Sequence, residues 1–301
     1  MRILSVGTFS GLSNTCLHRH WALERVAEKV DKINTSAPKL TLWYRITYHL
    51  FLYGLPIAIP ESVHENKKIK EYIDKYTYDL VWIDKGITIE AETLKYIKKK
   101  QPNCIIVSYS PDNMALRHNQ SLQYLNCIYY DYLITNKSYI LNDMKRLGAK
   151  NICFVNNSYE AKFHYPRTLS KDDYDRLGGD VGFVGMWEKE RCDSILYLAN
   201  HGIKVRIFGN KQWQKYKNYS PNLQIEDHGL HSEDYSKSLK AFKISLCFLR
   251  KMNFDQQTTR SVEIPACGGF MMAERTKEHQ AMFEENKEAI FFSSNEELLE
   301  K

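Results

Sequence analysis

Short apolar runs alternate with amphipathic stretches through the first half of the chain. Strands are predicted at 2–6, 30–34, 80–83, 104–109, 132–135 and 151–155. Helical patterns between them cover 15–29, 42–53, 65–76, 90–100, 119–128 and 137–147. Regular alternation of this kind predicts a mainly parallel sheet with helices on both faces.

A second alternation of the same kind fills the other half. Strands are predicted at 181–184, 205–208, 223–226, 244–248, 270–273 and 289–292, and helices at 189–201, 232–241, 259–267 and 276–285. The intervening stretch 166–179 is polar, contains proline and ends in Gly-Gly, which is typical of a linker. We therefore predict an α/β protein with two Rossmann-like domains, 1–165 and 180–301, whose ligand lies in a cleft between the carboxyl ends of their strands.

Composition narrows the class of protein. The chain has 301 residues, of which 43% are hydrophobic and 26% charged, as in ordinary globular proteins. A net charge of +6 suits an anionic ligand, but no clustered basic module indicates a nucleic-acid partner. Seven cysteines form no Cys-x-x-Cys pair, and several, such as Cys104, Cys153 and Cys247, lie in apolar runs. With no signal-peptide pattern at the start, we expect buried free thiols and a cytoplasmic protein.

Residues 40–60 form the most apolar segment of the first half. Arg45 and His49 interrupt it, and Gly54 and Pro56 end its helical part, so a bilayer-spanning helix is not predicted. We interpret it as a buried or half-buried domain helix. The alternative is an aromatic, basic face that touches a membrane or a lipid-linked substrate.

The stretch 255–274 carries the strongest candidate site. Thr258 and Thr259 are candidate N-caps for a short helix, on which Thr259, Arg260 and Glu263 share one face. A helix N-terminus suits a phosphate, and a carboxylate one turn further suits a sugar diol. We therefore predict a nucleotide pocket there. The alternative for Arg260 is a simple ion pair with Glu263.

Another arginine begins the helix that follows Gly185. A cation in the first turn opposes the helix dipole, so Arg191 is a second candidate for binding diphosphate. The alternative for this arginine is a salt bridge with Glu188 or Asp193.

The first half offers weaker candidates. Asp112 lies in a Ser-Pro-Asp-Asn turn after a predicted strand, where it is a candidate general base or acceptor contact, or only a turn residue. His18 follows a glycine-rich loop and is a candidate catalytic residue at the cleft. His18 and His20 are two apart on a helix and point away from each other, and no other His, Cys or Asp cluster has ligand spacing, so no metal site is predicted.

These residues resemble a known family. The matching segments are Val184-Gly185, Glu190-Arg191, 206–209 and, most densely, 259–270 with the sequence TRSVEIPACGGF. They are similar to the spore maturation protein CgeB-like glycosyltransferases, which have the two-Rossmann-domain GT-B fold. The resemblance implies a donor domain in the second half and an acceptor-side domain in the first. The final helix that crosses back onto the first domain in this family is not found before Lys301, so we expect a truncated copy.

The resemblance also implies roles for two acidic residues. A wider group of retaining GT-B enzymes has an E-x7-E motif, in which Glu263 takes the second position and would hold the ribose hydroxyls. Asp255 takes the first position in place of Glu and would lie near the donor sugar, with Gly185, Thr259, Arg260 and Arg191 at the nucleotide.

The resulting hypothesis is sugar transfer from a nucleotide-sugar donor to a polysaccharide, protein or lipid-linked acceptor. It is expected to retain the anomeric configuration and to need neither a metal nor another cofactor. The alternatives are a nucleotide-sugar epimerase and a non-catalytic nucleotide- or sugar-binding protein.

Overall fold

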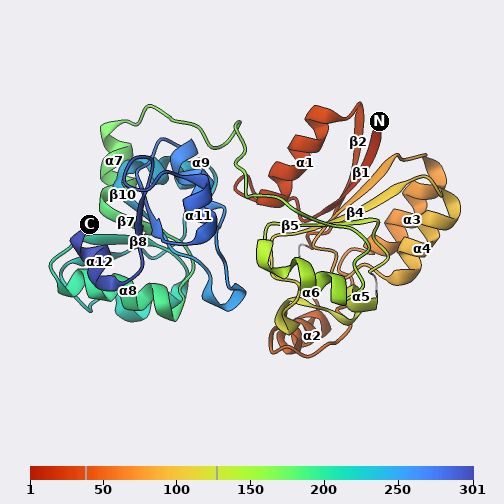
Figure 1. The fold of residues 1–301 in the computed structure, drawn as a ribbon, viewed down its shortest axis with the longest axis horizontal. Helices are drawn as coiled ribbons and strands as arrows, with labels where there is room; N and C mark the ends of the chain where they lie inside the picture. The colour runs from red at the N-terminus through yellow and green to blue at the C-terminus, as the bar shows by residue number, and fades with distance from the viewer. Residues whose placement is uncertain (38, 127) are drawn as a thin grey trace. The chain divides into compact units, whose positions relative to one another are not determined.

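The chain forms two compact units, each built around its own sheet. The computed structural model describes residues 1–37, 39–126 and 128–301. Unit 1 comprises residues 1–10 and 14–156, and unit 2 comprises residues 11–13 and 157–301 (Figure 1). Each unit has a six-stranded sheet whose strand pairs are parallel, which confirms the predicted fold class of two Rossmann-like domains.

In unit 1 the sheet has the strand order β2-β1-β3-β4-β5-β6. The strands are β1 (Arg2–Gly7), β2 (Lys29–Asn34), β3 (Leu80–Asp84), β4 (Ile105–Ser110), β5 (Tyr132–Thr135) and β6 (Ile152–Phe154). Side chains alternate between the two faces of each strand. Leu4 and Val6 therefore point into the main core with Val81 and Ile83.

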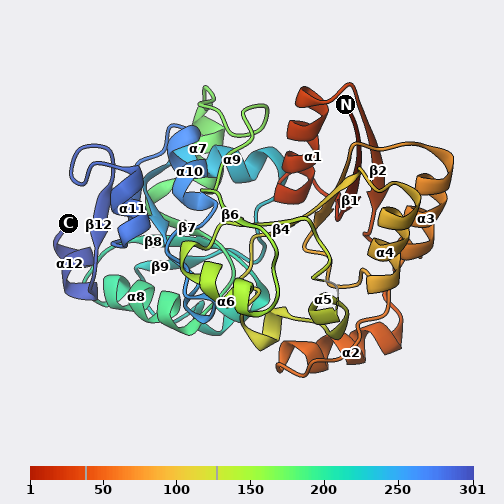
Figure 2. The ribbon, with the colours of Figure 1, turned by 45° about the vertical axis from the view of Figure 1, so that its right-hand side comes forward.

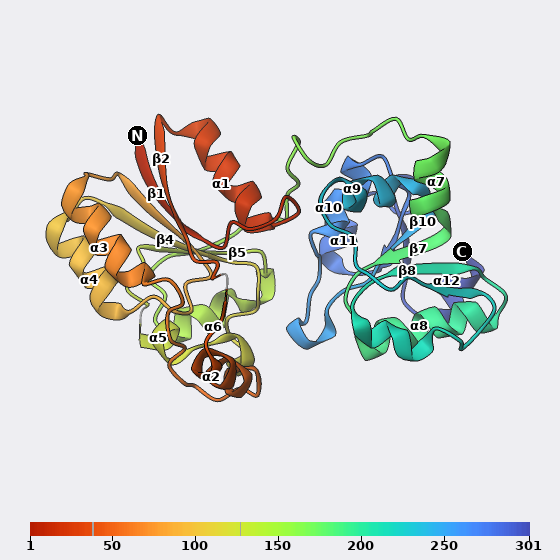
Figure 3. The same ribbon diagram turned by 180° about the vertical axis from the view of Figure 1, so that it is seen from behind.

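Helices cover both faces of this sheet. They are α1 (Thr15–Val26), α2 (Leu42–Leu52), α3 (Glu65–Lys75), α4 (Ala91–Lys100), α5 (Leu122–Asn126) and α6 (Leu141–Arg146), with short turns η1 (Arg117–Asn119) and η2 (Ser138–Ile140). Figures 1 and 3 show α3 and α4 together on one side of the sheet and α1 on the other. Asn14 begins α1 by accepting a hydrogen bond from the Cys16 amide. Helix α2 buries Thr47 and Phe51, but most of its other side chains are exposed, so it is more exposed than the preferred interpretation of 40–60 expects.

Unit 2 has the strand order β12-β11-β10-β7-β8-β9. The strands are β7 (Gly179–Val184), β8 (Val205–Phe208), β9 (Leu223–Ile225), β10 (Phe242–Cys247), β11 (Met271–Glu274) and β12 (Ile290–Phe292). The helices are α7 (Lys171–Leu177), α8 (Lys189–Asn200), α9 (Ser232–Ala241), α10 (Arg260–Ala266), α11 (Lys277–Met282) and α12 (Asn295–Glu300), with η3 (Lys211–Tyr216) and η4 (Lys251–Asn253). Figure 2 shows α8 on one face of the sheet and α7, α9 and α10 on the other.

The order of the strands reverses once in each sheet. In unit 1 the chain leaves β1 for β2 on one side and then returns to β3 on the other side of β1. In unit 2 it leaves β7 for β8 and β9 and returns to β10 beside β7. The loops after the two strands at such a point diverge and leave room for a ligand. The relevant edges are thus the carboxyl ends of β1 and β3, and of β7 and β10.

Several local expectations differ from the structure. The segment predicted as a linker, 166–179, contains helix α7 and lies within unit 2, and the boundary between the units falls after Asn156 rather than after residue 165. Its polar residues form a capping box, although their composition is also typical of a loop. The predicted helix 119–128 shortens to α5, and its residue 127 lies outside the described residues. Cys153, expected to be buried, is exposed because β6 is an edge strand.

The capping box of α7 gives a first prediction. The Ser170 hydroxyl accepts a hydrogen bond from the Asp173 amide at 3.1 Å, and the Asp173 carboxylate accepts one from the Ser170 amide at 3.0 Å. Substituting Ser170→Ala should lower the free energy of unfolding by about 1 kcal/mol, because an amide of the first turn loses its acceptor. Urea denaturation measures the change. Lys171→Ala, at an exposed neighbouring position, is the control and should change stability little; equal losses in both variants would contradict the role of the cap.

Candidate functional site

Three arginines meet at the strand-order reversal of unit 2. Arg191 lies in the first turn of α8, which follows β7. Arg250 follows β10, and Arg260 is the first residue of α10. All three belong to loops or helix starts at the carboxyl ends of β7 and β10, where ligands of such sheets bind.

The contacts of these arginines place them close together. The guanidinium carbons of Arg191 and Arg260 lie 5.9 and 5.8 Å from the centroid of the same Phe183 ring. One oxygen of Glu188 joins the other pair: its Oε1 is 3.6 Å from Arg191 Nη1 and 3.2 Å from Arg250 Nε. Arg191 therefore connects the other two arginines, through the Phe183 ring to Arg260 and through the Glu188 carboxylate to Arg250. We call Arg191, Arg250 and Arg260 the arginine cluster.

Burial and the neighbouring cations make the charge of Arg191 in the arginine cluster unfavourable. Arg191 is only 7% exposed, and burial lowers the pKa of its guanidinium. The Glu188 carboxylate opposes that decrease, whereas the charges of Arg260 and Arg250 add to it. The Arg191 Nε also has no hydrogen-bond partner among the described residues. A multiply charged anion would offset both the burial and the repulsion.

Gly185 holds Arg260 in position through its lack of a side chain. The Arg260 Nε donates a hydrogen bond to the Val184 carbonyl at 2.7 Å. A Cβ at position 185 would lie 3.1 Å from Arg260 Nη2 and 2.6 Å from Phe183 Cζ. Gly185 therefore packs closely against Arg260, and its predicted contact with the nucleotide stays a prediction.

Glu263 lies inside unit 2 rather than on an open face. Its side chain is 3% exposed, its Oε2 accepts a hydrogen bond from the Tyr235 hydroxyl, and its Oε1 is 3.5 Å from His164 Nε2. Burial raises the pKa of the Glu263 carboxyl, while the bond from Tyr235 and the charge of Arg260 oppose the increase. No ion pair joins Arg260 and Glu263 in the part of the chain that the structure describes, so the simple pairing considered for them is wrong.

The raised pKa of Glu263 predicts a specific pH dependence. Because the folded-state pKa exceeds the unfolded value of about 4.3, the stability contribution of its proton is present below that value and is lost as the pH rises through the folded pKa. Glu263→Gln cannot titrate. The melting temperature of the native chain should therefore fall relative to that of Glu263→Gln as the pH rises from about 4 to about 8.

Differential scanning calorimetry across this range checks the prediction. Glu300→Gln removes an exposed carboxylate of unit 2 and should show no comparable trend. A constant difference between the native chain and Glu263→Gln would mean that the Glu263 pKa is not raised.

The remaining predicted donor residues lie on the segment between β10 and α10. Thr259 precedes α10 in a helical conformation and makes no side-chain cap, and the Thr258 amide instead donates to the Ser261 hydroxyl. The expected threonine caps are therefore wrong, since Ser261 satisfies this end of the helix. Asp255 is half-buried, and its amide donates to the Arg250 carbonyl at 3.3 Å, which ties it to the arginine cluster.

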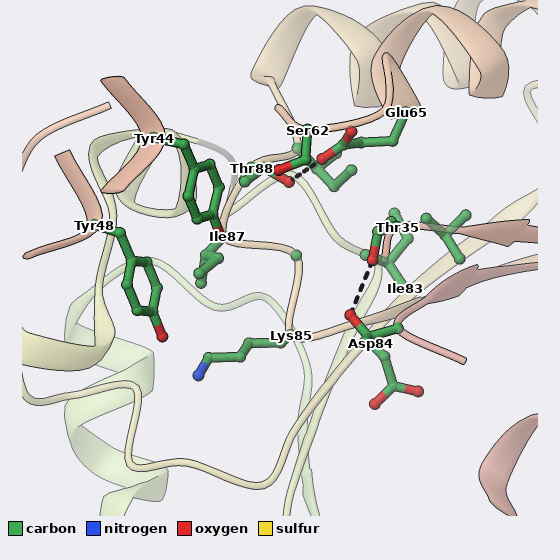
Figure 4. A pocket seen from close by; sticks show the side chains of 14 residues that line it. Thr35, Tyr44, Tyr48, Ser62, Glu65, Ile83, Asp84, Lys85, Ile87 and Thr88 are labelled. Atoms are coloured by element: carbon green, nitrogen blue, oxygen red, sulfur yellow. Dashed lines mark hydrogen bonds between the residues drawn. The ribbon is translucent and has the colours of Figure 1, made fainter. Parts of the chain in front are cut away.

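A cavity lies at the strand-order reversal of unit 1. It has a volume of about 210 Å³ and is lined by the ends of β1, β2 and β3 together with α2 and α3 (Figure 4). Tyr44 and Tyr48 lie side by side on α2, with ring centroids 5.7 Å apart and planes at 12°. At another wall the Thr88 hydroxyl donates to Glu65 at 2.6 Å. Aromatic rings among hydroxyl and carboxylate groups suit a polyhydroxylated ligand.

Two ion pairs border this cavity, since one member of each, Asp84 and Lys85, lines it. Lys85 Nζ donates to the Asp112 carboxylate at 2.5 Å, and Arg19 forms an ion pair with Asp84 at 2.6 Å. The predicted catalytic residue Asp112 is thus adjacent to the cavity through Lys85. The other predicted residue, His18, is buried in α1, with its ring 5.4 Å from that of Trp21.

Sequence reasoning missed parts of both sites. Arg250 follows the apolar run of β10 directly, and the rule that ligands bind beyond the carboxyl ends of strands would have identified it. Lys85 follows β3 in the same way. The tyrosines of α2 carried no such signal, because their place over the cavity depends on how α2 packs.

Some kinds of site are not found within residues 1–37, 39–126 and 128–301. No cluster of three or more His, Cys, Asp or Glu side chains is placed to hold a metal ion. Among the helices described, none combines the length and apolar character that crossing a bilayer requires. Neither observation tests whether catalysis uses a metal.

Comparisons with known proteins agree with this architecture. Residues 191–301 match the model of a family described as glycosyl transferase-like. A search of curated proteins gives no match. Among solved structures, the lipopolysaccharide outer core galactosyltransferase WaaB in its apo form has a TM-score of 0.57 at 12% identity, over 100% of this chain and 88% of that one.

Two further structures are similar over most of the chain. A trehalose-6-phosphate structure from E. coli, bound with UDP-2-fluoro glucose, has a TM-score of 0.59 at 12% identity over 91% of this chain and 84% of that one. The UDP-forming α,α-trehalose-phosphate synthase of Burkholderia xenovorans has a TM-score of 0.59 at 8% identity over 99% and 89%. At such identities the likeness shows the fold alone. The chain has the two-domain GT-B type of fold, and residues 191–301 match the glycosyl transferase-like family model.

Proposed function

We propose that the protein is a glycosyltransferase that moves a sugar from a nucleoside diphosphate sugar to an acceptor. The observation that carries this proposal is the arginine cluster at the carboxyl ends of β7 and β10. Support also comes from the glycosyl transferase-like match over residues 191–301, which contains Arg191, Arg250 and Arg260.

The diphosphate is the part of the donor that fits the arginine cluster. Guanidinium groups donate planar pairs of hydrogen bonds that match phosphate oxygens. Arg191 and Arg260 lie near the same Phe183 ring, and we place the diphosphate against both guanidinium groups. Two phosphates also carry enough charge to compensate these cations, of which Arg191 and Arg250 share the Glu188 carboxylate.

Transfer needs stabilisation of the leaving nucleoside diphosphate. Negative charge grows on the bridging phosphate oxygen as the bond to the sugar breaks, and prearranged cations stabilise that charge. We assign this role to Arg191 and Arg260 without a metal ion. Retention of the anomeric configuration is the expected outcome, and its support is the Asp255 to Glu263 spacing.

The sugar and ribose contacts are a separate assignment. Asp255 would lie near the donor sugar, since its backbone is bonded to Arg250 of the cluster. Glu263 would hold the ribose hydroxyls by exchanging its Tyr235 partner for a ligand hydroxyl. Thr259 lies one turn before Glu263 and would border the same nucleotide.

The acceptor is assigned to the cavity of unit 1. Its tyrosines and carboxylates fit the hydroxyl groups of a sugar, whether this belongs to a polysaccharide, a protein or a lipid-linked acceptor. Asp112, held by Lys85, would be the candidate base, and the catalytic role of His18 stays a prediction. A reducing, cytoplasmic location is part of the proposal and is supported by six free cysteines at described positions.

The arginine cluster predicts how nucleotides bind. UDP, GDP and ADP are titrated by calorimetry into the native chain, Arg191→Gln and Arg260→Gln. We expect each substitution to weaken binding of the preferred nucleotide about tenfold or more, because a hydrogen bond to a charged group contributes about 1.5–3 kcal/mol. The corresponding nucleoside without phosphates should bind weakly to all three proteins.

Arg176→Gln is the matched control for this experiment. Arg176 is also an arginine of unit 2, but it lies on α7 and pairs with Asp234 at 2.6 Å. Its loss should leave nucleotide affinity unchanged. Nucleotide binding that is insensitive to both cluster substitutions would overturn the assignment of the diphosphate.

The cavity of unit 1 predicts a separate effect on turnover. Lys85→Met removes the cation that holds Asp112 and should lower kcat/KM for the acceptor at least about tenfold, with the nucleotide Kd unchanged, because donor binding is assigned to unit 2. Product formation from radiolabelled nucleotide-sugar gives the measurement. Nucleotide binding without transfer to any acceptor would favour a binding protein, and sugar isomerisation without an acceptor would favour an epimerase.

A further inference from the structure

One face of α2 is apolar and exposed, although the helix is well packed on its other side. Its inward face carries Phe51 and Thr47, both buried, beside the two cavity tyrosines. The outward face consists of Leu42, Trp43, Ile46, Leu50 and Tyr53, and we call it the α2 outer face. Leu42 is 74% exposed, Trp43 64% and Tyr53 75%.

The spacing of these residues makes one continuous stripe. Trp43, Ile46, Leu50 and Tyr53 follow one another at intervals of three or four, which places them on one side of a helix. Leu40, Leu52 and Leu55 extend the exposed apolar surface at its ends. Figures 1 and 3 show α2 at the rim of unit 1, away from the sheet. Single exposed apolar side chains are common, but a contiguous stripe indicates a binding surface.

The charges around the α2 outer face identify the kind of partner. The sequence contains no Asp or Glu from Lys32 to Pro60. Exposed Lys39 and Arg45 flank the stripe, and Arg117 of η1 adjoins Gly54 at the end of the helix. Within residues 32–60 the charged side chains beside the stripe are therefore cations. This pattern is complementary to a surface with negative groups over an apolar interior.

We propose that the α2 outer face docks on an anionic phospholipid membrane, with α2 lying in the plane of the interface. A helix of 11 residues is about 16 Å long, about half the hydrocarbon thickness of a bilayer, so it lies along the surface rather than across it. Trp43 and Tyr53 stand near opposite ends of the stripe, and these residue types favour the headgroup region. Long basic side chains beside an apolar stripe reach the phosphates.

Vesicle binding by the full chain tests the proposal. Co-sedimentation uses vesicles of phosphatidylcholine alone and vesicles that also contain phosphatidylglycerol. We expect stronger binding to the anionic vesicles, and a loss of about fivefold for Arg45→Gln on those vesicles alone. Ile46→Glu should abolish most binding to both. Val26→Glu places the same charge at an exposed apolar position on α1 and should bind like the native chain.

Tryptophan fluorescence provides a second test, which uses the native chain and one conservative substitution. Tryptophan emission of the native chain should shift to shorter wavelength on anionic vesicles, and Trp43→Phe should remove most of that shift, because Trp43 enters the interface. Two outcomes would overturn the proposal. One is the absence of binding and of any emission shift on anionic vesicles; the other is a concentration-dependent dimer that Ile46→Glu dissociates, which would show that a second copy covers this face. Neither result bears on the sugar-transfer assignment, because the experiments use no nucleotide.

Discussion

Parallel strands impose the constraint on which both candidate sites depend. Two parallel neighbours are joined by a crossover connection, usually a helix. Successive strands are added along one side of the first strand until the chain returns and adds the next strand on its other side. At the reversal the two following loops separate, because their helices lie on opposite faces of the sheet. Unit 1 reverses beside β1 and unit 2 beside β7, so each sheet provides one opening at its carboxyl edge. Arginines lie at the opening of unit 2, whereas aromatic and polar side chains line the opening of unit 1.

The arginine cluster shows how the fold maintains a costly arrangement of charge. Phe183 is fully buried, and its ring supports two guanidinium groups from different elements. Glu188 compensates part of the positive charge, and Gly185 leaves space for Arg260. An unfavourable arrangement of this kind persists when the packing of the surrounding core leaves the side chains no alternative position. Such arrangements are common at functional sites. The cluster is therefore better understood as a preorganised anion site than as a source of stability.

The alternation of apolar runs and helical patterns was enough to predict both sheets, since buried parallel strands are short, continuous and apolar. It failed where polar residues form structure through hydrogen bonds, as in α7, whose capping box has the composition of a loop. At the sites, Arg191 and Arg260 could be proposed because cations are unusual in a first helical turn. The burial of Glu263 against Tyr235, and the common ring beneath the arginines, depend on contacts between distant segments. A single sequence does not contain that information.

The two sides of α2 have a thermodynamic consequence. Tyr44 and Tyr48 line the cavity, whereas Trp43 and Ile46 point outward from the same rigid turns of helix. A ligand that displaces the backbone of α2 through the tyrosines would also displace the outward side chains. Linkage is reciprocal: if occupation of the cavity changes the affinity of the outer face for its partner by some factor, the partner changes the affinity of the cavity by the same factor. Through α2, the affinity of the cavity for its ligand would then depend on whether the outer face is bound to its partner.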